Sequence, residues 1–202
     1  MPDTQLIPPS GGFRKLRSFQ CAQMVYDGTV IFCDRFVPKN SRTRDQMVQA
    51  ARSGVQNIAE GSLASATSKK TELKLTGVAR ASLGELLLDF EDYLRQRKLR
   101  QWEKTDPEAQ DVRNRWKQRS GGASDLSDKS DPSDVSDKSD SVNLYCFTKL
   151  PADVLANTMI CLINQTSYLL WQQMKSLEKD FLTHGGFTER MYHAHQNYRK
   201  QE

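Results

Sequence analysis

The sequence lacks the motifs of the common enzyme and metal-site classes. It has three histidines, and His193 and His195 are two residues apart, so on a helix they diverge and cannot chelate one ion together. It contains no G-x-S-x-G sequence, no P-loop and no cysteine near a histidine. The Glu-x-x-His partners of a di-iron bundle are missing around Glu72, Glu85, Asp89 and Asp92. We therefore expect a protein that is not an enzyme and holds no metal or other cofactor.

Cysteine pairs and long hydrophobic runs are scarce as well. The four cysteines form no C-x-x-C pair, and a helical chain of this size does not need disulfides, so we expect buried, reduced thiols. Residues 1–12 contain three prolines and no apolar run of the kind found in signal peptides. The most apolar segment, 154–174, is interrupted by Asn and Gln and cannot span a membrane. These absences favour a cytoplasmic protein.

The net charge of +4 is unevenly distributed along the chain. Residues 1–119 contain 21 Lys and Arg against 14 Asp and Glu, whereas residues 120–142 contain six Asp and two Lys. Residues 143–202 are nearly balanced, with six basic and five acidic side chains. An anionic partner such as RNA or DNA would therefore bind within residues 1–119.

Four long segments show the apolar repeat of an amphipathic helix, with hydrophobic residues every three or four positions. They span residues 13–36, 43–61, 69–98 and 151–183. Short helices are expected from Pro107 to Arg119 and at 188–199, and Gly28 is expected to allow close helix contact. The predicted fold is all-α: an antiparallel up-down-up-down four-helix bundle with an inserted short helix, a disordered loop and a C-terminal extra helix.

The expected helix ends depend on capping residues. Thr43 and Gln46 have the spacing of a capping box at the start of the second helix, and Gly61 is expected to end it. Thr105 and Glu108 have the same spacing at the start of the short helix.

The chain is expected to divide into four parts. Residues 1–12 are a flexible N-terminus, and residues 13–119 hold the first three bundle helices and the short basic helix. Residues 143–202 hold the fourth bundle helix and the C-terminal helix. Between them, residues 120–142 repeat SDLSDKSD as SDVSDKSD, which offers little to bury, so we expect a disordered loop.

Three stretches resemble a known group of helical proteins. Residues 53–61 (SGVQNIAEG) look like the central motif of the four-helix-bundle proteins encoded in intervening sequences of bacterial large-subunit ribosomal RNA genes. Residues 13–19 resemble their F-x-x-L opening, and residues 81–86 (ASLGEL) resemble their S-L-x-E-L pattern. The stretch 42–62, together with 76–86, is more closely similar to the four-helix-bundle suffix-domain group.

This resemblance covers nearly all of the chain except the Ser/Asp repeat, and it implies a homo-oligomer, a ring-like pentamer. The same superfamily includes the accessory variability determinant of diversity-generating retroelements, whose basic ring binds nucleic acid and contacts the reverse transcriptase. The resemblance thus implies RNA or DNA, or a protein such as a reverse transcriptase, as partners. The chain departs from the small intervening-sequence proteins in its insertion at 106–150 and its C-terminal helix.

Asn57 and Glu60 are three residues apart, so they share one helix face. One interpretation is a polar site at a subunit interface. We favour a structural role in which Glu60 pairs with an arginine such as Arg52 or Arg80, because a partly buried carboxylate needs a partner.

Two groups of basic residues are candidate nucleic-acid-binding sites. The first is expected near the first turn and combines Lys39, Arg42, Arg44, Lys69, Lys70 and Lys74. The second is the densest basic run, which comprises Arg95, Arg97, Lys98, Arg100, Lys104, Arg113, Arg115, Lys117 and Arg119. Trp102 and Trp116 are interleaved with it, and aromatic residues with arginines suit single-stranded nucleic acid.

Each group has an alternative interpretation. The first could be an ordinary solvated surface, and the second could pack its tryptophans inward or dock the acidic repeat. The leading hypothesis is a non-catalytic oligomeric bundle that binds nucleic acid, or scaffolds a nucleic-acid-processing partner, through basic surfaces. The alternative is a protein–protein interaction module with no nucleic-acid role.

Overall fold

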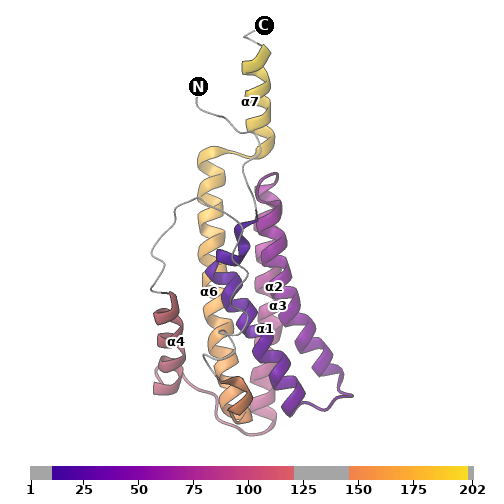
Figure 1. The fold of residues 1–202 in the computed structure, drawn as a ribbon, viewed down its shortest axis with the longest axis vertical. Coiled ribbons are helices and arrows are strands. Elements are labelled where there is room, and N and C mark those ends of the chain that lie inside the picture. Colours follow the sequence, from indigo (N-terminus) through magenta and orange to yellow (C-terminus); the bar gives the residue numbers. More distant parts are fainter. Residues whose placement is uncertain (1–10, 121–145, 200–202) are drawn as a thin grey trace.

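The computed structural model describes residues 11–120 and 146–199, which are mostly helical and contain no strand (Figure 1). The all-α expectation is confirmed over this part of the chain. The long helices are α1 (Arg17–Phe36), α2 (Arg42–Ala64), α3 (Lys69–Gln96) and α6 (Ala152–His184). The shorter elements are η1 (Gly12–Lys15), α4 (Pro107–Ser120), η2 (Phe147–Lys149) and α7 (Phe187–Arg199). Within these two stretches, every helix is too short or too polar to cross a bilayer.

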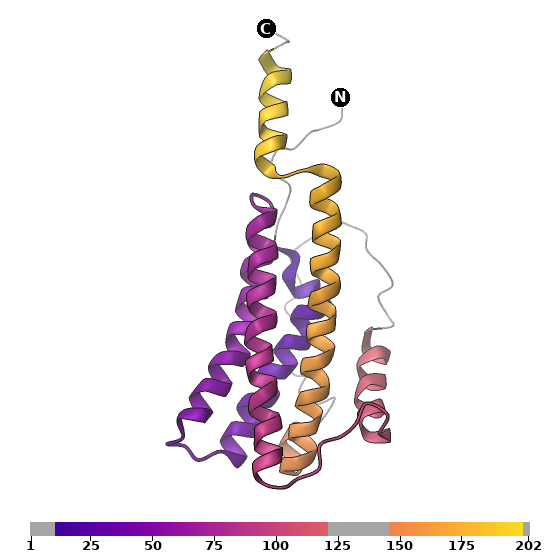
Figure 2. The same ribbon diagram turned by 180° about the vertical axis from the view of Figure 1, so that it is seen from behind.

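The four long helices pack side by side, and we call them the helical body (Figure 1 and Figure 2). α1 contacts α2 and α6, and α3 contacts the same two helices. The apolar stripes of all four helices meet in one core. Within this core the centroid of the Phe32 ring of α1 lies 4.9 Å from that of the Phe90 ring and 4.7 Å from that of the Tyr93 ring of α3. Edge-to-face aromatic contacts of this kind add to the stabilisation that burial provides.

Two glycines let the helices approach closely. A Cβ atom at Gly54 of α2 would lie 2.9 Å from the Leu83 side chain of α3. A Cβ atom at Gly28 of α1 would lie 2.5 Å from the Met159 sulfur of α6. Both distances are shorter than a carbon contact allows, so a larger residue would force the facing side chain to move. The close helix contact expected at Gly28 is confirmed.

The starts of the first two helices differ from the prediction. Leu16 is extended, with φ −68° and ψ 124°, and it separates η1 from α1, so the helix expected from residue 13 is interrupted. α2 begins at Arg42 after Ser41, and no side chain caps it. The capping box predicted at Thr43 is therefore not formed, because Thr43 is already inside the helix.

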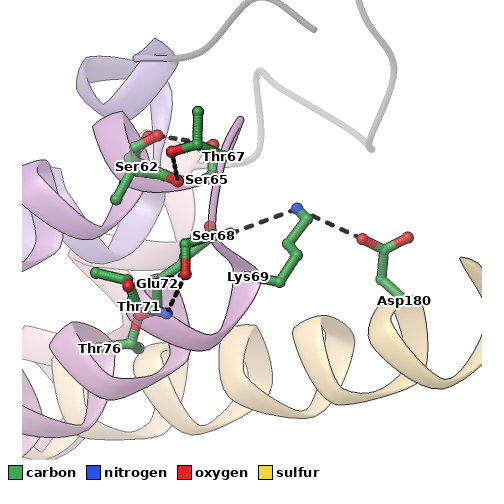
Figure 3. Close-up of polar contacts among 10 residues, drawn as sticks. Ser62, Ser65, Thr67, Ser68, Lys69, Thr71, Glu72, Thr76 and Asp180 are labelled. Carbon is green, nitrogen blue, oxygen red and sulfur yellow. Dashed lines mark hydrogen bonds and ion pairs between the residues drawn. The ribbon is translucent and has the colours of Figure 1, made fainter. Parts of the chain in front are cut away.

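The turn between α2 and α3 also comes later than predicted. α2 continues past Gly61, which was expected to end it, because Gly61 is buried against α3, with its Cβ position 3.4 Å from the Glu72 backbone oxygen. α3 then starts at Lys69, as predicted. Ser68 caps α3 by accepting a hydrogen bond of 3.1 Å from the Thr71 N–H (Figure 3).

α4 lies on the outside of the helical body and packs on α6. It starts at Pro107, as predicted. The residue before it is Asp106, so Thr105 is one position too early for the predicted capping box. The Asp106 carboxylate accepts a hydrogen bond of 2.9 Å from the Glu103 N–H. The buried residues of α4 are Ala109, Val112 and Trp116. Of the predicted flexible N-terminus and Ser/Asp loop, residues 1–10 and 121–142 lie outside the described residues.

Contacts between distant segments define two ends of the helical body. At the end with the turn between α2 and α3, the Lys69 ammonium of α3 lies 3.4 Å from the Asp180 carboxylate of α6 (Figure 3). At the end with the turn between α1 and α2, Arg35 of α1 donates a hydrogen bond of 2.9 Å to the Phe147 backbone oxygen, close to the start of α6. We call these the α2–α3 end and the α1–α2 end.

Candidate nucleic-acid interface

The structure separates the first predicted group of basic residues into two. Three of its members, Lys39, Arg42 and Arg44, lie at the α1–α2 end, whereas α3 carries Lys69, Lys70 and Lys74 at the opposite end. The reason is the length of α2, whose 23 residues separate the two turns. At about 1.5 Å per residue this is roughly 35 Å. The prediction of one shared patch is therefore wrong.

The three members at the α1–α2 end are partly neutralised. Arg44 donates a hydrogen bond to the Asp34 carboxylate, which raises the pKa of Arg44, and Asp45 lies 3.9 Å away. Arg42 lines a groove that Asp45 also lines. Lys39 is exposed in the turn. A phosphate group would therefore meet competing carboxylates here.

The second predicted group is largely engaged by its own chain. Ion pairs with N–O distances of 2.6–2.7 Å join Arg95 to Asp92, Arg100 to Asp106 and Arg115 to Asp111. Arg113 donates to two backbone oxygens, and the Arg97 guanidinium lies 3.8 Å from the centroid of the Tyr93 ring. The other members are exposed or have a side chain outside the described residues: Lys98, Lys104, Lys117 and Arg119.

The tryptophans of this group do not form a stacking platform. Trp116 is 1% exposed and belongs to the core, and Trp102 is half-buried against the core. Trp102 is also held through its backbone N–H, which donates 2.7 Å to the Asn157 side chain of α6. The alternative interpretation, in which the tryptophans pack inward, is confirmed, because α4 folds back onto α6.

A different group of cations, which the sequence analysis did not assemble, lies at the α2–α3 end. The starts of α1 and α3 and the last turns of α6 all reach this end, and each contributes exposed Lys or Arg side chains. In the described stretches these residues form no ion pair. We call them the basic end group: Arg14, Lys15, Arg17, Lys70, Lys74, Lys175 and Lys179.

Among the described residues, five acidic side chains share this end with the basic end group: Glu60, Glu72, Glu178, Asp180 and Glu189. Two of them are already engaged, because Glu72 and Asp180 each lie 3.4 Å from the Lys69 ammonium. The cations at this end therefore outnumber the carboxylates available to neutralise them. The alternating direction of successive helices was the signal that would have placed the starts of α1 and α3 together.

Two aromatic side chains project from α6 beside the basic end group. Tyr168 and Trp171 are exposed, with ring centroids 6.1 Å apart and an interplanar angle of 29°. The Lys175 ammonium lies 4.3 Å from the centroid of the Trp171 ring. Spacings of three and four residues put the three side chains on one face of the helix. This spacing is readable in the sequence, but the sequence analysis considered only Trp102 and Trp116 as aromatic partners of basic residues.

A polar groove of about 700 Å³ opens between α2 and α3 toward the α1–α2 end. Its lining residues are Arg42, Asp45, Gln46, Gln49, Ala50, Ser53, Ser82, Glu85 and Asp89. Burial raises the pKa of Asp89, and the neighbouring Asp92 and Glu85 raise it further. Since carboxylates outnumber cations in the lining, the groove does not suit phosphate.

Asn57 takes part in a polar contact between α2 and α3. Its amide donates to the Ser53 backbone oxygen at 2.8 Å and to the Ser53 hydroxyl at 3.1 Å. The Ser53 hydroxyl in turn lies 3.0 Å from the Ser82 hydroxyl of α3. This network fixes α2 against α3 on the side that carries the polar groove.

Glu60 does not form the ion pair predicted for it. Its side chain is exposed, as are Arg52 and Arg80, and in the described part of the chain it pairs with neither. A hydrated carboxylate needs no partner. The buried carboxylate nearby is Glu72, which is 7% exposed (Figure 3). Burial raises the pKa of Glu72, and Lys69 opposes the shift.

The four acidic residues that were compared with a di-iron bundle do not all lie in one place in the described part of the chain. Glu72 lies at the α2–α3 end, whereas Glu85 and Asp89 line the groove toward the other end. No group of three or more His, Cys, Asp or Glu in residues 11–120 and 146–199 is placed to hold a metal ion.

Cys33 is buried as expected, and burial raises its pKa to about 11, so its thiolate is scarce at neutral pH. Cys146, in contrast to the expectation, is exposed.

Comparison with known proteins finds no family model, no curated protein and no solved structure that matches this chain. The resemblance to the four-helix-bundle suffix-domain group therefore rests on the short motifs alone. The N-I-A-E-G motif lies near the C-terminal end of α2, where Ile58 and Gly61 are buried. Helix packing explains these two positions without a functional site.

Proposed function

We propose that this chain is a non-catalytic, antiparallel four-helix-bundle protein that binds nucleic acid, or scaffolds a nucleic-acid-processing partner, at its α2–α3 end. The observation that carries the proposal is the basic end group. Its cations are exposed, meet no carboxylate in the described residues, and lie beside the exposed Tyr168–Trp171 pair.

The physical basis is the field of unneutralised cations. A phosphate backbone that binds Lys or Arg releases condensed counterions, which favours binding. A Lys or Arg that is already paired with a protein carboxylate contributes less to this release. The exposed rings add a second contribution, since stacking of a base on an aromatic side chain is worth about 1–3 kcal/mol. A single strand, whose bases are accessible, uses both contributions, whereas a duplex uses only the first.

Fluorescence anisotropy with labelled oligonucleotides tests the proposal. Single-stranded RNA, single-stranded DNA and duplex DNA would be titrated with the full chain at several salt concentrations. We expect binding whose logarithm falls linearly with the logarithm of salt concentration, and tighter binding to single strands than to duplex.

A matched pair of double variants locates the site. Lys70→Glu/Lys74→Glu changes the basic end group, and Lys104→Glu/Lys117→Glu makes the same charge change with exposed lysines at the opposite end. We expect the first to weaken binding roughly tenfold or more and to flatten the salt dependence, and the second to change affinity less than about twofold. Equal effects of the two variants, or affinity that is indifferent to salt, would contradict the proposal.

A second candidate function is a protein–protein interaction module, and the polar groove favours it. The groove carries Asp45, Glu85 and Asp89 with one arginine, Arg42, so it suits a basic or polar protein segment better than a phosphate. In that case the oligonucleotide titrations would show no binding at moderate salt. Substitution of Asp89 would then change partner binding, and the basic end group would not.

A further inference from the structure

The exposed rings of Tyr168 and Trp171 are carried by a firmly packed stretch of α6. Leu170 and Leu177 of the same stretch are buried, so this part of the helix is held against the core. Tyr168 is 52% exposed and Trp171 is 39% exposed, and in the described chain no other large hydrophobic residue of α6 before Phe181 is exposed. The two rings therefore lie in solvent on a rigid support.

Contacts within α6 orient the two rings. Their planes are 29° apart, so the rings are nearly parallel. The Gln172 amide donates a hydrogen bond of 2.8 Å to the Tyr168 hydroxyl. The Lys175 ammonium lies 4.3 Å from the centroid of the Trp171 ring. Exposed rings in this arrangement form a platform on which another flat ring can stack.

The side chains around the platform are polar. Asn164 and Gln172 are four residues from Tyr168, Lys175 is four residues from Trp171, and all three are exposed. This spacing places them on the same side of the helix as the rings. An apolar protein segment needs a continuous hydrophobic patch, which is missing here. A nucleotide base, which has flat faces and polar edges, suits isolated rings among polar groups.

Charge on this side of α6 favours an anionic ligand. Lys175 and Lys179 lie there with one exposed carboxylate, Glu178, each at a helical spacing from one of the rings. The next carboxylate of α6, Asp180, is held in an ion pair. A methylated ammonium group also binds to tryptophan, but Lys175 would repel it. A base attached to a phosphate satisfies both the rings and the lysines.

Lys175 can respond to a bound base. Its ammonium covers part of the Trp171 ring, so a base that stacks there takes its place. Stacking of a base is stronger than an exposed cation–π contact, so this exchange is favourable. The lysine side chain is long and flexible, so the displaced ammonium can reach the phosphate next to the stacked base.

We infer that Tyr168 and Trp171 form a stacking site for an unpaired base, and that Lys175 leaves the Trp171 ring for the adjoining phosphate when the base binds. The inference rests on the proposed function and assigns its preference for single strands to three residues of α6. The lysines of the basic end group bind any phosphate backbone, whereas the rings need a base that is accessible. Bases of RNA and of DNA are equivalent for this contact.

Fluorescence anisotropy of the full chain tests the inference with three labelled probes of equal length. They are a single strand of thymidines, the same backbone with abasic sites throughout, and the duplex of the first strand with its complement. We expect wild type to bind the base-bearing strand about tenfold more tightly than the abasic strand, because only the first can stack.

Two exposed tyrosines provide matched variants. Tyr168→Ala removes a ring of the platform, and Tyr198→Ala removes a ring of similar exposure, 64%, on α7. We expect Tyr168→Ala and Trp171→Ala each to weaken binding of the base-bearing strand about tenfold, to change binding of the abasic strand less than about twofold, and to reduce the preference over duplex. Tyr198→Ala should stay within about twofold of wild type with every probe.

Tryptophan fluorescence reports the stacking directly. Trp116 is buried and Trp102 is half-buried, so Trp171 is the tryptophan that a base can reach. We expect the base-bearing strand to quench the emission and the abasic strand to leave it unchanged. Trp171→Phe keeps an aromatic ring, so it should bind with little loss but without the quenching.

Lys175→Ala tests the exchange of contacts. We expect it to reduce the slope of the salt dependence by about one for the base-bearing strand. Lys104→Ala, which removes an exposed lysine at the opposite end, should leave that slope unchanged. Equal slopes for the two variants would overturn the role of Lys175.

The outcomes separate the inference from the proposed function. Salt-dependent binding with equal affinity for base-bearing and abasic strands, or Tyr168→Ala that binds like Tyr198→Ala, would overturn the inference and leave the proposed function standing. Absence of binding to all three probes would overturn both. Circular dichroism checks that the variants keep their helix content, and Trp171→Phe and Tyr168→Ala decide the matter if Trp171→Ala does not fold.

Discussion

The two ends of the helical body carry similar kinds of side chain, but these side chains differ in ion pairing and in burial. At the α1–α2 end, Arg44, Arg95, Arg100 and Arg115 each pair with a carboxylate. At the α2–α3 end, the ion pairs of the described residues gather on Lys69, and the basic end group is left in solvent. Tryptophan follows the same division, since Trp116 is buried toward the first end and Trp171 is exposed toward the second.

This difference shows that the density of basic residues along a sequence is a poor guide to an anionic site. The run from Arg95 to Arg119 is the richest in cations. Asp92 and Asp111 nevertheless lie three and four residues from their partners on the same helix, and Asp106 lies six residues from Arg100 in the segment before α4. Pairs three or four residues apart on a helix meet readily. A phosphate binds where cations lack such partners, and that depends on which chain segments meet in space.

The largest expected effect compares the two tryptophans. Trp116→Ala removes a buried side chain that joins α4 to the core, and we expect it to lower the free energy of unfolding by about 3–5 kcal/mol. Trp171→Ala removes an exposed ring, and we expect a loss below about 1 kcal/mol. Urea unfolding of both variants measures the difference. Equal losses would mean that α4 is not packed on α6 as described.

The next effect concerns two asparagines of α6. Asn157 is buried, and its side chain bonds the Trp102 N–H at 2.7 Å and the Arg100 backbone oxygen at 2.9 Å. Asn157→Ala leaves these groups unpaired, and we expect a loss of about 1–3 kcal/mol in the free energy of unfolding.

Asn164→Ala is the matched control for this prediction. Asn164 is exposed, and its amide donates within its own helix to the Ile160 backbone oxygen. We expect a change within about 0.5 kcal/mol. If Asn157→Ala were as mild as Asn164→Ala, the link between α6 and the segment after α3 would be unimportant for stability.

The smallest effect compares the buried carboxylate of Glu72 at one end with the half-buried carboxylate of Asp89 toward the other end, as pH changes. The pKa values of Glu72 and Asp89 are both raised in the folded state, so the folded state binds these protons more tightly than the unfolded state. The stability that this contributes is fully present below the unfolded pKa, and it is lost as pH rises through the folded pKa. The free energy of unfolding of Glu72→Gln and of Asp89→Asn, each relative to wild type, should therefore increase from pH 4 to pH 7.

The two substitutions should differ in how much they change the free energy of unfolding at pH 7. Asp89 has carboxylate neighbours, so Asp89→Asn should stabilise the protein at pH 7. Glu72→Gln also loses the ion pair with Lys69, so its gain should be smaller. Unfolding curves recorded at each pH measure both. For either variant, a relative stability that falls as pH rises would contradict the raised pKa of that carboxylate.

Most of the helices could be predicted from the sequence because an amphipathic repeat is a local property. The starts of α3 at Lys69 and of α4 at Pro107 follow from residues next to them. The end of α2 does not, since Gly61 ends a helix in isolation but here packs against α3 and lets the helix continue. The candidate site was harder to predict, because it needs the relative direction of three helices.

By itself, the sequence determined the class of structure: repeating apolar residues must turn inward, and short polar links must connect successive helices. Tertiary structure decided which charges are neutralised and which rings are covered. The physical reason is that ion pairing and burial act over a few ångströms between atoms, whereas Lys70 and Lys175 are far apart along the chain and reach the same end only after folding.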